Sequence, residues 1–440
     1  MQLSDELFLS RRGILRGGAI AALAGMFPVH GAFAQQRQAW PKVEALLANY
    51  VSDRKVANMV AGLGIGAEAP QFLAQGSDSL KGDRTADSRS LYRIYSMTKP
   101  ITGMAAMILV DQGKLQLDQP ISDFLPKFAR MQVQKVYDGP VSEDNLEPAV
   151  RPITIRHLLT HTAGLGYSIV QQGPIAEAYK EAGLTPFQVT RNAAMPAFAG
   201  TPAPSLEVFA DRLADMPLVY QPGTHWSYSV GLDLLGRIIE IVSGQTFDGF
   251  LQDHILGPCG MVDTSFTVPR AKADRLTTNY IVAGSMLLPI DSAENSIFFD
   301  PPAFPFGGAG LVSTPADYDR FLKMLVGYGN LDGKRVMSEA AIRLGTSDLF
   351  PKTMDGADEF SKSAGFGAGG RVGRGAEAGS YGWSGAAGTV AFADLKHGLR
   401  AGLFTQYMPS QAYPLTSAFP DAVKSDLGGA ALSRDTGMSE

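Results

Sequence analysis

Two strand-type segments at opposite ends of the chain most constrain its fold. Residues 60–77, VAGLGIGAEAPQFLAQGS, predict two short strands around a turn, and residues 388–407, GTVAFADLKHGLRAGLFTQY, predict a hairpin that turns at His397-Gly398. Neither segment has enough strand partners near it in the sequence. The simplest arrangement is one antiparallel sheet built from both ends of the chain and flanked by helices, which is an α+β fold.

The rest of the 440 residues is dominated by helical patterns. Residues 101–113 are apolar on nearly every side, which predicts a buried helix that ends at a glycine. Between residues 115 and 290, prolines and glycines separate helical segments and strand alternation is scarce. We therefore expect an α/β domain formed by residues 35–114 and 291–440, with a mainly helical domain, residues 115–290, inserted into it.

The amino-terminal residues 1–34 have the features of an export signal. Arg11 and Arg12 form a paired basic region, residues 19–27 form a short apolar stretch, and Ala32-Phe33-Ala34 is a small-residue cleavage site. The apolar stretch is too short to span a bilayer. We expect a twin-arginine-type signal peptide, a periplasmic location, and no stable membrane insertion once the signal has been removed.

Composition and motif context argue against several classes of function. The formal net charge is −5 with both signs spread along the chain, whereas nucleic-acid binding favours a clustered basic surface. Cys259 is the only cysteine, which excludes an intramolecular disulfide and a cysteine-based metal site. His157 and His161 have the spacing of a zinc pair but lack the glutamate of H-E-x-x-H, so packing explains them better. The glycine-rich residues 307–314 lack the strand–helix context of a dinucleotide site. We expect neither a metal nor a cofactor.

A Ser-x-x-Lys pattern occurs twice, and its context separates the two copies. In YSMTKP, residues 95–100, Ser96 stands at the start of the buried helix, where free backbone N–H groups and the helix dipole favour developing negative charge. Lys99 lies on the same face one turn later, and burial makes a lysine a better base. Ser52 and Lys55 instead lie on a charged helix face. The alternative for the first pair is an N-capping serine followed by an incidental lysine.

Tyr228, in the segment QPGTHWSYSVGLDLLG, is the candidate partner for this serine. It precedes a helix and is placed to share a proton with Lys99 and Ser96, as base during acylation and as acid toward the leaving group. The alternative role is an aromatic residue that packs where a helix begins. Tyr328 is a weaker candidate because it precedes a surface turn.

The segment YGWSGAAGTV, residues 381–390, offers a place for the substrate. Its small residues allow a substrate to lie against the strand, Trp383 would form a pocket wall, and a backbone N–H near Ala386 would join that of Ser96 as an oxyanion hole. Residues 382–386 also imitate the G-x-S-x-G nucleophile elbow except at the last position. Strand-type sequence follows where that motif needs a helix, which makes an α/β-hydrolase a weak alternative.

Taken together, the chain resembles the serine β-lactamase and penicillin-binding protein superfamily, and most of all the class C β-lactamases and the family VIII carboxylesterases. The resemblance runs from about residue 45 to residue 425. The order and spacing of its motifs carry it: YSMTK, HLLTHTAGL, PGTHWSYS, GGAGLVST and WSG. It implies a β-lactamase/transpeptidase-like fold with the site between the two domains. It also implies Ser96 as nucleophile, Lys99 and Tyr228 as its general base pair, and no cofactor.

Two departures from the family pattern bear on the substrate. Val230 replaces the asparagine of Tyr-x-Asn, which removes an amide that would contact a substrate's side-chain amide. Trp383-Ser384-Gly385 replaces Lys-Thr-Gly, so an apolar wall stands where a lysine would attract a carboxylate. Both changes favour neutral esters. We expect a serine carboxylesterase that cleaves small or medium acyl esters through a Ser96 acyl-enzyme. The alternatives are a β-lactamase, D-amino-acid peptidase, amidase or transacylase on the same scaffold, or a non-catalytic penicillin-recognising protein.

Overall fold

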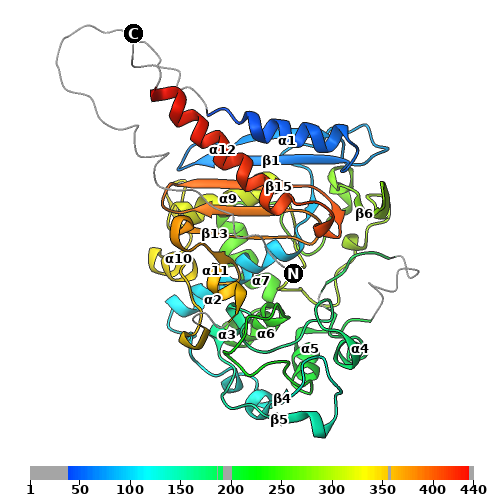
Figure 1. Ribbon diagram of the computed structural model, residues 1–440, viewed down its shortest axis with the longest axis vertical. Coiled ribbons are helices and arrows are strands. Elements are labelled where there is room, and N and C mark those ends of the chain that lie inside the picture. Colours follow the sequence, from blue (N-terminus) through cyan, green and yellow to red (C-terminus); the bar gives the residue numbers. More distant parts are fainter. Residues whose placement is uncertain (1–37, 186, 192–200, 355–357, 436–440) are drawn as a thin grey trace, which may run out of the picture.

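The structure is a computed structural model that describes residues 38–185, 187–191, 201–354 and 358–435. The expected export signal, residues 1–34, lies outside these ranges. Figure 1 shows a layer of strands above a group of helices, with α1 (Pro41–Ser52) and α12 (Leu415–Asp435) on the outer side of the strands.

A seven-stranded antiparallel sheet joins the two ends of the chain, in the order β11-β12-β13-β14-β15-β1-β2. The junction pairs β1 (Asn58–Ile65) with β15 (Leu399–Phe404). The expected α+β fold with one sheet from both chain ends is therefore confirmed. The remaining strands of this sheet are β2 (Gln71–Gly76), β11 (Gly365–Phe366), β12 (Arg371–Val372), β13 (Ser380–Ser384) and β14 (Val390–Asp394).

The alternating side chains of β1 separate two hydrophobic cores. Met59, Ala61 and Leu63 pack with α1 and α12 on the outer face. On the inner face, which α9 (Pro315–Val326) covers, a Cβ at Gly64 would collide with the buried Arg400 side chain. Arg400 needs that space because its Nε pairs with Asp319 of α9 at 2.7 Å, which compensates for its burial.

The inner core is built around α2 (Thr98–Asp111), which is buried from Thr98 to Leu109 and therefore needs the all-round apolar sequence noted above. Gly113 follows the helix with a φ of 67°, as a helix-ending glycine does. Helix α6 (Gly231–Ser243) packs against α2. The other helices are α3 (Ile155–Leu159), α4 (Gly173–Glu181), α5 (Leu206–Leu213), α7 (Phe247–Leu251), α8 (Gly257–Cys259), α10 (Glu339–Gly345) and α11 (Glu359–Ser363).

Within the described ranges, short strands form four smaller sheets. They pair β3 (Tyr92–Arg93) with β8 (Val312–Ser313), β4 (Gln132–Gln134) with β5 (Leu146–Pro148), β9 (Asn330–Leu331) with β10 (Lys334–Arg335), and β6 (Asn279–Ala283) with β7 (Met286–Asp291) and β16 (Tyr407–Met408). The range expected to be mainly helical thus also holds strands, and β6 pairs with a strand near the carboxyl end. The division into two domains stays a prediction. No helix within the described ranges has the length and apolarity needed to cross a bilayer.

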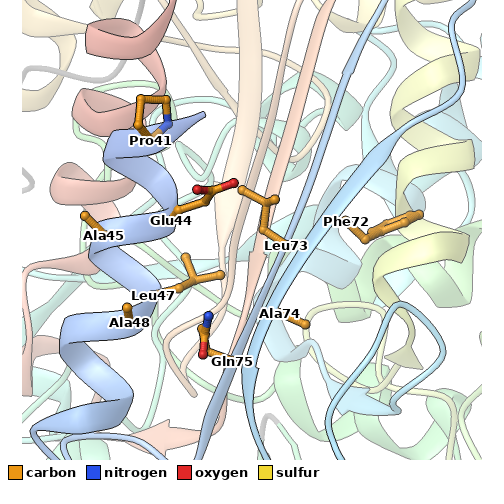
Figure 2. A pocket seen from close by; sticks show the side chains of 9 residues that line it. All are labelled: Pro41, Glu44, Ala45, Leu47, Ala48, Phe72, Leu73, Ala74 and Gln75. Atoms are coloured by element: carbon orange, nitrogen blue, oxygen red, sulfur yellow. The ribbon is translucent and has the colours of Figure 1, made fainter. Parts of the chain in front are cut away.

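An open groove of about 540 Å³ lies between α1 and the edge strand β2. Figure 2 shows Leu73 and Gln75 pointing toward α1, whereas Phe72 and Ala74 point to the opposite face of the sheet, as strand periodicity requires. Because α2 lies in the inner core, this groove is separated by the sheet from the candidate active site.

Candidate active site

Ser96 lies in a tight 3₁₀ turn, Tyr95–Met97, that leads directly into α2. The sequence predicted that Ser96 stands at the start of the helix. In the structure it lies in the short turn just before α2 begins at Thr98. Tyr95 has a φ of 40°, a strained value for a residue with a side chain. Asn279 Nδ2 donates a hydrogen bond to the Tyr95 hydroxyl at 3.2 Å, and the Tyr95 ring packs against Phe187. These contacts hold the strained turn in place.

Lys99 is fully buried beside Ser96. Its Nζ lies 3.2 Å from Ser96 Oγ and donates to the carbonyl oxygen of Gly308 at 2.7 Å. The first pair of the Ser-x-x-Lys pattern thus meets inside the protein. The second pair differs, because α1 ends at Ser52 and Lys55 lies in the turn after it, not on a helix face, where it pairs with Asp53 at 3.0 Å.

Tyr228 lies beside Lys99, as expected. Lys99 Nζ is 4.5 Å from the centroid of the Tyr228 ring, and the Tyr228 hydroxyl accepts a hydrogen bond from Trp383 Nε1 at 3.2 Å. That donor stabilises negative charge on the phenol oxygen when the hydroxyl gives up its proton. None of the hydrogen bonds in the described ranges joins the phenol oxygen to Ser96 or Lys99.

The alternative tyrosine, Tyr328, has different neighbours. Its hydroxyl donates to the carbonyl oxygen of Leu395 at 3.2 Å, and the guanidinium of Arg343 lies 4.2 Å from its ring centroid. No contact of the described residues links it to Ser96 or Lys99. The geometry therefore favours Tyr228 as the partner of the serine.

Strand β13 ends against the nucleophile turn. A Cβ at Gly385 would overlap the carbonyl oxygen of Ile94, so a glycine is required for this approach. The backbone N–H groups of Ser96 and Ala386 donate to no backbone acceptor among the described residues. The two donors proposed for the oxyanion hole are therefore available, while Trp383 and Ser384 are half-buried beside them.

Aromatic side chains form a wall around Tyr228 and Trp383. Trp383 packs against Tyr228 and Phe366, with ring centroids 5.7 Å and 5.2 Å away, and Trp226 stacks on Phe360 at 4.1 Å. The sequence indicated Trp383 alone. Phe360 and Phe366 come from α11 and β11, and no spacing within the sequence shows that these segments reach the site.

His161 supports Tyr228 and was not predicted as a site residue. It is fully buried, and the centroid of its ring lies 4.7 Å from that of Tyr228. Its Nδ1 accepts a hydrogen bond from the Ser229 N–H at 3.2 Å. Burial, together with the charge of Lys99, lowers the pKa of His161 well below 6.5, so the ring is neutral. The only signal in the sequence was its position in the HLLTH segment.

His157 has a separate role in the same segment. Its Nδ1 accepts from the Thr154 N–H at 3.2 Å, which closes a capping box at the start of α3. Burial lowers its pKa to about 4. The two histidines thus have different partners, and no group of three or more potential metal ligands occurs within the described ranges.

The chain is similar to known proteins over most of its length. The family model described as Beta-lactamase matches residues 43–419. The chain is 37% identical over 286 residues to protein Rv1367c of Mycobacterium tuberculosis, covering 65% of each chain. It is 29% identical over 299 residues to esterase EstB of Burkholderia gladioli, covering 64% of this chain and 69% of that one. The match to the first relative thus spans slightly less than two thirds of its length.

Solved structures share this fold, and EstCE1 is an example. EstCE1, described as a hydrolase with promiscuous acyltransferase activity, superposes with a TM-score of 0.69 and 23% identity, and the match covers 87% of this chain and 98% of that chain. The β-lactamase/transpeptidase-like fold expected from the sequence is confirmed.

Proposed function

The chain belongs to the beta-lactamase family, and we propose that within this family it is a serine hydrolase that cleaves small or medium acyl esters. One observation carries the proposal: the buried Lys99 Nζ lies 3.2 Å from Ser96 Oγ. Strand β13, which carries the apolar Trp383, ends against the turn that holds this serine. A relative named as an esterase, EstB, supports the same reaction class.

The proposed cycle uses four residues of this chain. Ser96 Oγ attacks the ester carbonyl carbon while Lys99 and Tyr228 take the hydroxyl proton. The N–H groups of Ser96 and Ala386 bind the oxyanion of the tetrahedral intermediate. Its collapse breaks the bond to the alcohol, which leaves with the proton returned by Tyr228. Water then attacks the acyl carbon and gives a proton to the same pair. Collapse of this second tetrahedral intermediate breaks the acyl–Oγ bond, and the pair returns the proton to Ser96 Oγ as the acid is released.

Two features of the site favour a neutral ester over a substrate that carries a carboxylate or a side-chain amide. Trp383 presents an indole ring where a lysine would attract a carboxylate, and its neighbours are the aromatic rings of Tyr228 and Phe366. Val230 is fully buried and offers no amide to the site. A substrate carboxylate would therefore be desolvated without a partner, which is costly.

The proposal is tested with two p-nitrophenyl esters, the acetate and the butyrate, beside a chromogenic cephalosporin. We expect turnover of both esters, far slower turnover of the cephalosporin, and loss of ester hydrolysis in Ser96→Ala. Full activity of Ser96→Ala, or an inactive wild-type protein, would overturn the esterase mechanism. Faster turnover of the cephalosporin than of the esters would favour the β-lactamase alternative.

Acyl transfer to an alcohol is the second candidate function. Trp226, Trp383 and Phe366 form an aromatic wall. This apolar surface can bind the organic part of an alcohol acceptor, whereas it offers no favourable contact to water. Adding a primary alcohol to the ester assay separates the two: transfer yields a new ester, whereas hydrolysis yields the free acid alone.

We further propose that the protein is exported to the periplasm. Arg11 and Arg12, the short apolar stretch and Ala32-Phe33-Ala34 support this location. Amino-terminal sequencing of the periplasmic protein should place the first residue near Gln35. Retention of the full chain in the cytoplasm would contradict the proposal, and an Arg11→Lys/Arg12→Lys variant should block export.

A further inference from the structure

Asp233 is a buried carboxyl group beside the proposed base, and the cycle described above gives it no role. It lies in the first turn of α6 and is 1% exposed. Its Oδ1 accepts a hydrogen bond from the Gly308 N–H at 2.9 Å, but Oδ2 has no hydrogen-bond partner among the described residues. A half-satisfied buried carboxylate costs folding free energy, so a functional reason for it should be sought.

The backbone of Gly308 connects Asp233 to Lys99. Its N–H donates to the Asp233 carboxylate, and its carbonyl oxygen accepts from Lys99 Nζ at 2.7 Å. The carbonyl oxygen of Gly307 accepts from Thr102 Oγ1 of α2, also at 2.7 Å. The backbone of these two glycines is therefore held between α2 on one side and α6 on the other.

Both positions require glycine for this path. A Cβ at Gly308 would lie 2.6 Å from Asp233 Oδ2, and one at Gly307 would lie 2.5 Å from the carbonyl oxygen of Leu232. The glycines of GGAGLVST thus let the backbone pass between two helices. They bring the two peptide groups that flank the Gly308 Cα into contact with the carboxylate and with the lysine, respectively.

We propose that Asp233 is a positioning residue that orients the Gly308 backbone, so that the Gly308 carbonyl oxygen holds Lys99 beside Ser96 and the ammonium that Lys99 forms is stabilised. The inference rests on the proposed function, because it takes Lys99 as the base. A carboxylate in this low-dielectric site stabilises the ammonium that forms when Lys99 accepts the proton of Ser96. Asp233 therefore supplies the buried negative charge that faces this ammonium.

The other titratable groups around Lys99 do not supply this negative charge. The rings of Tyr167 and Tyr228 face Nζ, and His161 lies behind Tyr228. Burial raises the pKa of Tyr167 well above 10 and keeps His161 neutral. Burial also raises the pKa of Asp233, to about 6, against the opposing charge of Lys99, so its carboxyl group is ionised above that pH.

The test is the pH profile of Asp233→Asn. The asparagine Oδ1 can still accept from the Gly308 N–H, while the charge is removed. We measure kcat/KM for p-nitrophenyl butyrate and the rate at which a p-nitrophenyl phosphate triester labels Ser96, both from about pH 5 to about pH 10. The acid limb of both profiles should move down by about one pH unit, the lower end of the effect of a nearby charge.

Asp248→Asn is the matched control. Asp248 is also in the first turn of a helix, α7, but is exposed, so its amide should leave the profile unchanged. An acid limb of folded Asp233→Asn that superimposes on the wild type overturns the inference. Absence of labelling at Ser96 in the wild type overturns the proposed function instead. If Asp233→Asn does not fold, the smaller neutral Asp233→Ser must show the same shift.

Discussion

Asp233→Asn should also change the pH dependence of folding stability by an amount that the structure sets. Burial raises the pKa of this carboxyl group from 3.8 to about 6. A raised pKa means that the folded state binds the proton more tightly than the unfolded chain. Its contribution to stability is fully present below pH 3.8 and is lost as the pH rises through about 6. A difference of roughly two pKa units corresponds to about 3 kcal/mol.

Urea unfolding of the wild type, Asp233→Asn and Asp248→Asn between about pH 4 and pH 7 measures this contribution. The free energy of unfolding of Asp233→Asn should gain about 2–3 kcal/mol on the wild type across that range, because the asparagine never ionises. Any constant difference reports the unpaired amide hydrogens of the asparagine, which cost about 1–3 kcal/mol at every pH. Asp248→Asn should run parallel to the wild type. Parallel curves for Asp233→Asn would refute the reasoning, since they would show that Asp233 ionises freely in the folded protein.

Three further changes test other parts of the structure. Tyr228→Phe should lower kcat for p-nitrophenyl butyrate by about 10²–10⁴-fold, the usual contribution of a general acid–base, whereas Tyr328→Phe should leave it unchanged; the reverse order would move the base to Tyr328. Gly385→Ala should reduce kcat strongly, because its Cβ would push β13 away from the nucleophile turn, whereas Gly428→Ala in α12, with open space around it, should retain activity; an active Gly385→Ala would contradict the close approach. His157→Asn should lose less stability in acid than the wild type, as measured by urea unfolding, because burial lowers the pKa of His157 from 6.5 to about 4. The stabilising contribution of the neutral ring is present above pH 6.5 and is lost as the pH falls toward 4, so equal acid sensitivity of the two proteins would argue against its burial as a neutral ring.

The sequence by itself determined the features that depend on local order. Strand periodicity near both chain ends predicted the sheet in which β1 pairs with β15, since neither segment has enough strand partners near it in the sequence. The all-round apolar run predicted α2 as a buried helix, and the spacing of three residues brought Ser96 and Lys99 onto one face. Tyr228 and Trp383 were predicted from motif order, and the structure brings them together.

Only the tertiary structure decided which distant groups surround this pair. Asp233 and Gly308 reach Lys99 because α6 packs against α2 with a glycine backbone between them, and no sequence spacing encodes that contact. The aromatic wall likewise joins Trp226 to Phe360, from segments more than a hundred residues apart. Local propensity acts over a few residues, whereas the charge and shape of the site depend on how whole elements pack. The pH response of the site is therefore a property of the fold.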